Sequence, residues 1–211
     1  MKKIVLAFII GILCTFFITN YNETIETALA DSVIRLHVIA NSDRENDQKL
    51  KLKVRDAVLE KFGNELDTYE GIDYSRAEIE KNLELIENCA RDVIDSSGYD
   101  YDVKASLGKS DFPTKTYGDV TLPAGTYEAL KIEIGKAEGK NWWCVMFPPL
   151  CFVDGSCVEV PEQSEEYLKS SLGDDTYEMI TKSDELPVAF KFKAYEIWQN
   201  GKQAIKKIAS K

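Results

Sequence analysis

The sequence predicts an α+β fold in a single domain over residues 31–201, with the element order β-α-α-β-β-β followed by C-terminal helices. Polar and apolar residues alternate in four segments, at 33–40, 101–107, 130–134 and 142–147, as they do in half-buried strands. Between the first and second of these segments, two stretches carry apolar stripes at helical spacing. Short turns between the last three strands favour a mainly antiparallel sheet with the helices on one face.

The first thirty residues are predicted to be a signal peptide or a short membrane anchor. Lys2 and Lys3 precede an uncharged apolar run, Ile4–Ile18, and Ala28-Leu29-Ala30 has the small-x-small pattern of a cleavage site that ends at Ala30. The run is shorter than the ~20 residues that a membrane-spanning helix needs, which favours cleavage and export over a retained anchor.

The first predicted strand, Val33–Ala40, leads directly into the first predicted helix. Ser42 and Glu45 have the S-x-x-E spacing of a capping box at the start of this helix. Apolar residues then recur at helical spacing as far as Phe62, and Gly63-Asn64 predicts the end.

A second capping box, Ser75 with Glu78, predicts the start of the second helix, and Ser96-Ser97-Gly98 predicts its end. Cys89 lies beside its apolar stripe. That stripe consists of Ile79, Leu83, Ile86, Ala90 and Val93.

The second and third predicted strands are separated by a segment, Asp111–Pro123, that is predicted to be a loop. Beyond Pro161 the spacing becomes helical again, and Pro187 predicts the start of a last helix that ends near Asn200-Gly201. Alternation around Phe190 also fits a strand there, and residues 202–211 form a basic tail.

Charge and motif content exclude several classes of function. The formal net charge is −10, from 36 acidic and 26 basic residues, so the surface repels nucleic acid and anionic lipid headgroups. There is no P-loop, no G-x-G-x-x-G and no EF-hand loop, and one histidine without any C-x-x-C pair fits no zinc pattern. We therefore expect no cofactor, no metal and no nucleic-acid partner.

No residue pattern marks a catalytic site. His37 shares a predicted strand face with Arg35, which favours a satisfied, half-buried histidine. The sequence has no G-x-S-x-G or D-T-G setting for a serine nucleophile or an aspartate pair. We expect a protein that is not an enzyme, with an exported hydrolase that uses His37 or carboxylates as the alternative.

Two segments, 35–56 and 141–154, carry the features that favour recognition. Trp142 and Trp143 are adjacent on a strand and must point to opposite faces, so one can enter the core while the other needs cover from another layer or a partner. The alternative interpretation is a turn, a helix cap and two core tryptophans. The candidate contact residues are Arg35, His37, Asn41, Asp43, Lys51 and Arg55, together with Trp142 or Trp143.

Four cysteines follow residue 30, and they allow three disulfide pairings. A four-residue loop from Met146 to Pro149 would place Cys144 opposite Cys151, which makes that bridge geometrically reasonable. Cys89 with Cys157 would be the remaining pair.

The two segments together resemble the stage II sporulation protein R family, over the signal-like start and nearly all of residues 31–200. The residues that carry the resemblance are the run Arg35–Asp56 and the run Asn141–Asp154, with its tryptophans, prolines and cysteines. Cys89 and Cys157 are not part of the family pattern.

This resemblance implies a role in endospore formation. Members are made in the forespore, exported into the space between the two membranes, and needed to activate a membrane-embedded aspartic protease that processes pro-sigma factor E in the mother cell. The resemblance implies action by binding rather than by catalysis. A structural protein of the septal space, held by an uncleaved N-terminal helix, is the second alternative.

Overall fold

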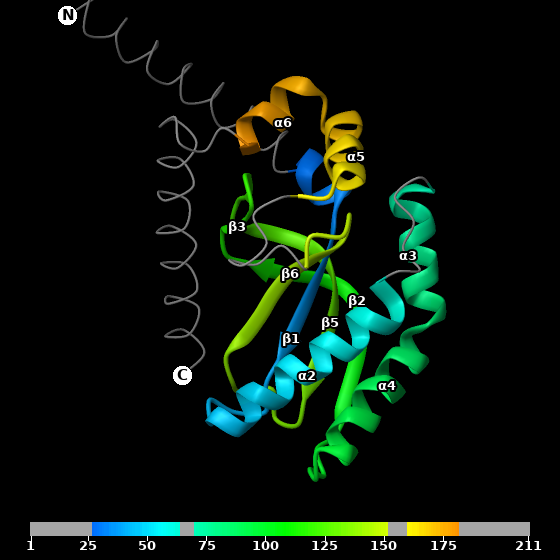
Figure 1. Ribbon diagram of the computed structural model, residues 1–211, viewed down its shortest axis with the longest axis vertical. Helices are drawn as coiled ribbons and strands as arrows, with labels where there is room; N and C mark the ends of the chain where they lie inside the picture. Colours follow the sequence, from blue (N-terminus) through cyan, green and yellow to red (C-terminus); the bar gives the residue numbers. More distant parts are fainter. Residues whose placement is uncertain (1–26, 64–69, 152–159, 182–211) are drawn as a thin grey trace, which may run out of the picture.

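The computed structural model describes residues 27–63, 70–151 and 160–181. Its centre is a four-stranded sheet with the strand order β2-β5-β1-β6 (Figure 1). The strands are β1 (Ile34–Ile39), β2 (Val103–Phe112), β5 (Gly125–Ile134) and β6 (Asn141–Phe147). Two of the three strand pairs are antiparallel, so the predicted α+β class and mainly antiparallel sheet are confirmed.

The first strand of the domain lies inside the sheet. β1 runs parallel to β5 on one side and antiparallel to β6 on the other, so the short turn between β5 and β6 must cross the end of β1. Both faces of β1 are also covered, because Ile34, Leu36 and Val38 are buried on one face and Arg35 and His37 on the other. The expected half-buried strand is therefore a core strand.

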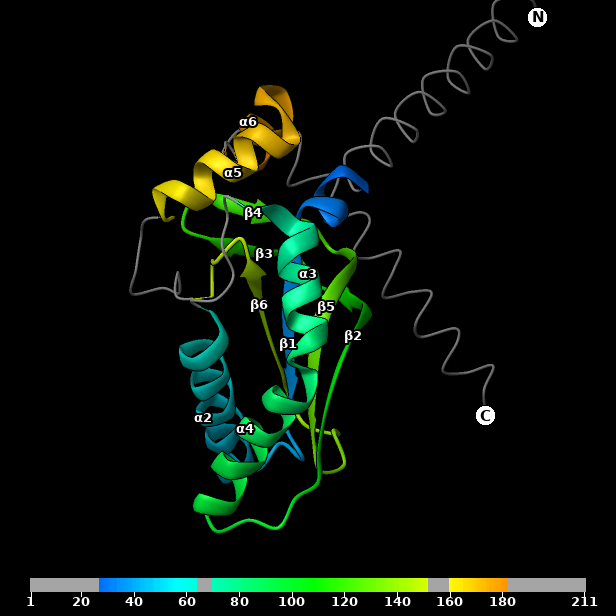
Figure 2. The same ribbon diagram turned by 90° about the vertical axis from the view of Figure 1, so that its right-hand side faces the viewer.

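Helices α2 (Glu45–Phe62), α3 (Gly71–Lys81) and α4 (Leu83–Ser96) lie along one side of the sheet, as predicted (Figure 2). The apolar stripes predicted from helical spacing supply the packing of this layer. The buried residues include Leu50, Val54, Val58 and Phe62 of α2 and Ile86, Ala90 and Ile94 of α4.

The second predicted helix is two helices, and its start was misplaced. The helix is interrupted at Asn82, which lies between α3 and α4 and whose side chain donates to the Glu78 carbonyl oxygen at 2.9 Å. Ser75 lies within α3 and is fully buried, so it is not a cap.

The prediction of a capping box at the start of α2 is also wrong, because the Ser42 hydroxyl does not cap the helix. The residue at the N-cap position is Arg44, which makes no side-chain capping bond. The Ser42 hydroxyl instead bonds the carboxylate of Asp47, while Glu45 pairs with Lys49 at 2.6 Å.

The segment Asp111–Pro123, predicted to be a loop, contains a small hairpin of β3 (Lys115–Tyr117) and β4 (Val120–Leu122). The helices predicted beyond Pro161 are present as α5 (Glu162–Leu172) and α6 (Asp174–Thr181). Both lie near one end of the sheet, on the same side of the molecule as the hairpin (Figures 1 and 2).

Residues 27–32 form a helical turn that leads into β1. Within the described ranges, no helix is long and apolar enough to cross a membrane. The apolar run Ile4–Ile18, the helix predicted from Pro187, the basic tail 202–211 and Cys157 lie outside the described residues.

Candidate interaction site

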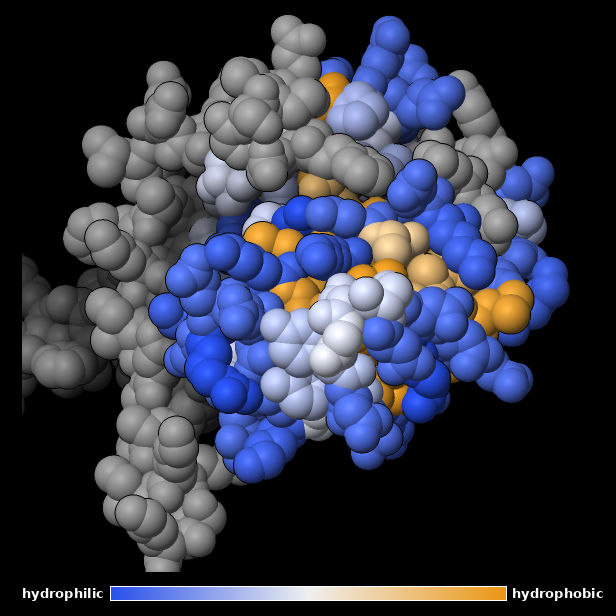
Figure 3. All heavy atoms as spheres, turned by 60° about the horizontal axis from the view of Figure 1, so that its bottom comes forward, coloured by the Kyte–Doolittle hydropathy of each residue, from blue (hydrophilic) through white to orange (hydrophobic). Residues whose placement is uncertain are grey.

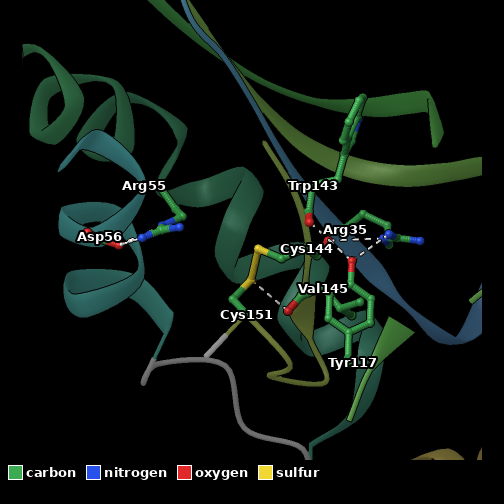
Figure 4. The surroundings of a disulfide bond; sticks show 8 residues. All are labelled: Arg35, Arg55, Asp56, Tyr117, Trp143, Cys144, Val145 and Cys151. Atoms are coloured by element: carbon green, nitrogen blue, oxygen red, sulfur yellow. Dashed lines mark hydrogen bonds and ion pairs between the residues drawn. A yellow bond between two sulfur atoms is a disulfide. The ribbon is translucent and has the colours of Figure 1, made fainter. Parts of the chain in front are cut away.

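Arg35 lies in the core, on the face of the sheet opposite the helices. It is fully buried, with its guanidinium carbon 4.3 Å from the centre of the Phe112 ring and 4.9 Å from that of Tyr127. Its Nε donates to the Cys144 carbonyl oxygen at 3.1 Å, and its Nη2 donates to the Tyr117 hydroxyl at 2.9 Å (Figure 4). Arg35 therefore fastens the β3–β4 hairpin to β6, and its burial removes it from any accessible contact surface.

Tyr117 completes the link between the hairpin and the sheet. Its hydroxyl, which accepts from Arg35, also donates to the Trp143 carbonyl oxygen at 3.3 Å. Burial raises the pKa of Tyr117 despite the opposing effect of Arg35, so the phenol stays protonated and keeps its donor.

His37 is buried two residues further along the same face. Its ring stacks on that of Trp143, with centroids 6.0 Å apart and planes inclined by 22°. Burial lowers the pKa of His37, Lys131 lowers it further, and Asn141 and Glu133 oppose the change. His37 is thus buried rather than half-buried, and neither of its ring nitrogens makes a hydrogen bond to the described residues, so it differs from the satisfied histidine expected from the sequence.

Asn41 and its neighbours fasten the β5–β6 turn across the end of β1. The Asn41 Oδ1 accepts from the Lys136 amide at 3.0 Å, and its Nδ2 donates to Asp47 at 3.0 Å. The Gly139 amide donates to the Ala40 carbonyl oxygen at 2.9 Å. We call this turn, residues 135–140 with their contacts to residues 40–43, the strap.

Asp43 and Lys51 both bond Lys140 of the strap. The Lys140 amide donates to Asp43 at 2.7 Å, and the Lys140 carbonyl oxygen accepts from the Lys51 ammonium at 3.0 Å. The Lys51 side chain is nearly buried and also donates to Gln48 at 2.7 Å, and burial lowers its pKa. Asn41, Asp43 and Lys51 therefore hold the strap in place, whereas the sequence offered a contact surface or, for Asn41 to Asp43, a turn and a cap.

Asp47 supports the strap and was missed by the sequence analysis. Burial alone would raise the pKa of Asp47, but hydrogen bonds from Ser42, Asn41 and Tyr101 and the charge of Arg44 lower it overall. The carboxylate is therefore held in its charged form, bonded on every side by donors.

Trp142 and Trp143 lie in β6, which is an edge strand of the four-stranded sheet. The guanidinium of Arg55 lies 4.0 Å from the centre of the Trp142 ring, and the ammonium of Lys115 lies 5.4 Å from that of Trp143. Both tryptophans are half-buried. The prediction that they point to opposite faces is confirmed, and each carries a cation on its ring. The two tryptophans with Arg55 and Lys115 form what we call the tryptophan edge.

The Cys144–Cys151 disulfide is present, with the two Cα atoms 5.0 Å apart (Figure 4). It closes the turn after β6, where the Leu150 amide donates to the Val145 carbonyl oxygen at 3.1 Å. The Cys151 sulfur also contacts that oxygen at 2.9 Å. The bridge thus fixes the end of the strand that carries both tryptophans.

Removal of this disulfide is expected to destabilise the domain by roughly 2–3 kcal/mol, because the bond closes a short loop in the unfolded chain. Urea unfolding with and without a reducing agent measures the effect. The double variant Cys144→Ser, Cys151→Ser should match the reduced protein and not respond to the reductant. A reductant effect of equal size in the double variant would contradict this assignment.

The second predicted pair is not supported. Cys89 is a free, buried thiol on α4, and Cys157 lies outside the described residues. The Cys89 side chain packs in the apolar core, where burial raises the pKa of its thiol and keeps it protonated.

An open pocket lies beside the strap, lined by residues from 41–44, 100–102 and 135–138. Hydrophilic residues cover most of this end of the molecule, and apolar residues appear only in scattered groups (Figure 3). In the described ranges, no group of three or more histidine, cysteine or acidic residues could hold a metal ion. The predicted contact residues are thus divided among the core, the strap and the tryptophan edge, and the tryptophan edge presents two half-buried tryptophan rings.

The chain matches the family described as Stage II sporulation protein R over residues 30–157. The chain belongs to this family. A Bacillus subtilis (strain 168) protein named Stage II sporulation protein R is 38% identical over 145 residues, which cover 69% of this chain and 65% of the relative. The chain thus aligns with just under two thirds of that relative's length. No solved structure matches the chain.

The family match includes β1, the strap, the Arg35 contacts and the tryptophan edge, and it supports a role in sporulation. Tyr117 and Lys115, which complete the Arg35 contacts and the tryptophan edge, were missed because their segment was predicted to be a loop. A hairpin signal was present, since Gly118-Asp119 separates two short runs of alternating residues.

Proposed function

We propose that this protein is an exported signal of endospore formation that activates a membrane-embedded aspartic protease, which then processes pro-sigma factor E in the mother cell. The protein is exported from the forespore into the space between the two membranes and acts there by binding. The observation that carries this proposal is the family match over residues 30–157, which includes the whole of both recognition segments, 35–56 and 141–154. Activation requires stronger binding to the active state of the protease than to its inactive state.

The tryptophan edge is the surface that best fits this role. Tryptophan and arginine are among the residues most often found at interface hot spots. Here two half-buried tryptophans lie on an edge strand, and the half-buried Arg55 of α2 lies on the ring of Trp142. The disulfide holds the end of the same strand, which reduces the conformational entropy that binding would cost.

Cleavage of pro-sigma factor E tests this function when the protease and its substrate are co-produced in a bacterium that does not sporulate. We expect cleavage only when the full-length chain is also produced. Without residues 1–30 the protein should not be exported, and cleavage should be lost. No cleavage with all three proteins present would contradict the proposal and favour the hydrolase or the septal-space alternative.

In the same assay, Trp142→Ala and Trp143→Ala are each expected to reduce cleavage by about ten-fold or more, the size of an interface hot spot. Leu85→Ala removes an exposed apolar side chain, 52% accessible, from α4 and should leave cleavage unchanged. Trp143→Phe, which keeps an aromatic ring on His37, separates lost contact from lost stability. Full cleavage by both alanine variants would exclude the tryptophan edge as the contact surface.

A further inference from the structure

The chain enters the fold before the residue at which the sequence predicts cleavage. Leu29 and Val33 are fully buried members of the hydrophobic core. Residues 27–32 are helical, and the Ser32 hydroxyl donates to the Ala28 carbonyl oxygen at 2.7 Å. The predicted cleavage site therefore lies inside an ordered turn of the domain.

The small-x-small pattern has a structural explanation in this turn. Ala28 and Ala30 are partly buried on either side of Leu29, where the helical turn packs against the domain. Proteolysis prefers exposed, flexible segments, and the bond after Ala30 lies in a helix next to a buried side chain.

Cleavage after Ala30 would remove Leu29 from the protein. If the cut came before folding, the domain would fold without one of its largest fully buried side chains, and the Ser32 hydroxyl would lose its acceptor. A complete core is therefore formed only by a chain that keeps residues 28 and 29.

We propose that the chain is not cut after Ala30, and that the apolar run Ile4–Ile18 stays attached to the domain and holds it at a membrane surface. The point of attachment is the residue 27–32 turn, at the end of the sheet where α5 and α6 lie (Figures 1 and 2). This end faces the membrane, and the strap at the opposite end of β1 faces away from it.

The N-terminus of the exported protein tests this proposal directly. The full chain, with a C-terminal epitope tag, is exported from a Gram-positive bacterium, purified from the membrane and soluble fractions, and sequenced from its N-terminus. We expect an N-terminus ahead of Leu29 and recovery with the membranes. An N-terminus at Asp31, or recovery of the bulk of the protein in the soluble fraction, would overturn the proposal.

A substitution at Leu29 gives an independent readout, because a residue that is discarded cannot affect the mature protein. Leu29→Ala should lower the melting temperature of the exported protein by roughly 5–15 °C through the cavity that it leaves. Asp31→Asn, at the exposed neighbouring position, is the matched control and should leave that temperature unchanged. Equal melting temperatures for Leu29→Ala and the unmodified chain would contradict the proposal. Neither of these two measurements involves the protease. Their results are therefore independent of whether the proposed function is correct.

Discussion

Replacing Arg35 with alanine is expected to lower the free energy of unfolding by about 3–5 kcal/mol. The change leaves a cavity between the Phe112 and Tyr127 rings and removes the donors to the Cys144 carbonyl oxygen and the Tyr117 hydroxyl. It also removes favourable cation–π contacts at a fully buried position. Equilibrium urea unfolding measures the loss.

The loss has two sources, the volume of the removed side chain and its hydrogen bonds. One variant separates them, and a second is the control for removing a cation. Arg35→Met restores much of the volume without the donors, and it should recover part of the loss. Lys104→Ala removes a cation from an exposed position on β2 and should change the free energy of unfolding by less than about 0.5 kcal/mol. If Arg35→Ala were as mild as Lys104→Ala, the assignment of Arg35 to the core would be wrong.

Asn41→Ala is expected to cost about 2–4 kcal/mol of unfolding free energy, because it leaves buried polar groups without partners. The Lys136 amide loses its acceptor and the Asp47 carboxylate loses a donor, so the strap separates from the end of β1. Asn88→Ala, at an exposed position of α4, is the matched control and should be nearly neutral.

Asn41→Asp provides a pH test of the same contact. The new carboxylate would face Asp47 where an amide now donates at 3.0 Å, so two like charges would lie together at neutral pH. Protonation of one of them relieves the repulsion, so the deficit relative to the unmodified chain should shrink as the pH falls below about 5. A deficit that is constant between pH 7 and pH 4 would show that these side chains do not interact.

The element types were predictable from the sequence because buried apolar residues recur about every 3.6 positions in a helix and every second position in a strand. The stripes of α2 and α4 and the alternation in β5 depend on local spacing, and all of them are present in the structure. The pairing of Cys144 with Cys151 was also predictable, since both residues belong to one short turn.

The candidate site was less predictable because its contacts join residues about a hundred positions apart. No local pattern shows that Arg35 reaches Tyr117, or that Asn41 holds the Lys136 amide. Polar residues after a strand are typical of a turn and a cap, which was one interpretation of Asn41 to Asp43. Here Ser42 bonds Asp47 at the start of α2, while Asp43 accepts from the distant Lys140 amide. A Cβ on Gly139 would also collide with the Ser42 carbonyl oxygen.

The central position of β1 also determines when the domain can fold. The strand made first must pair with β5 and β6, and Arg35 aligns with Val145, which the ribosome adds 110 residues later. At roughly 5–20 residues per second, β1 stays without either neighbour for about 5–20 seconds of synthesis. Pairings at such long separation also close slowly. A translocation machinery that accepts only unfolded chains could therefore engage this protein during the seconds before β1 is paired.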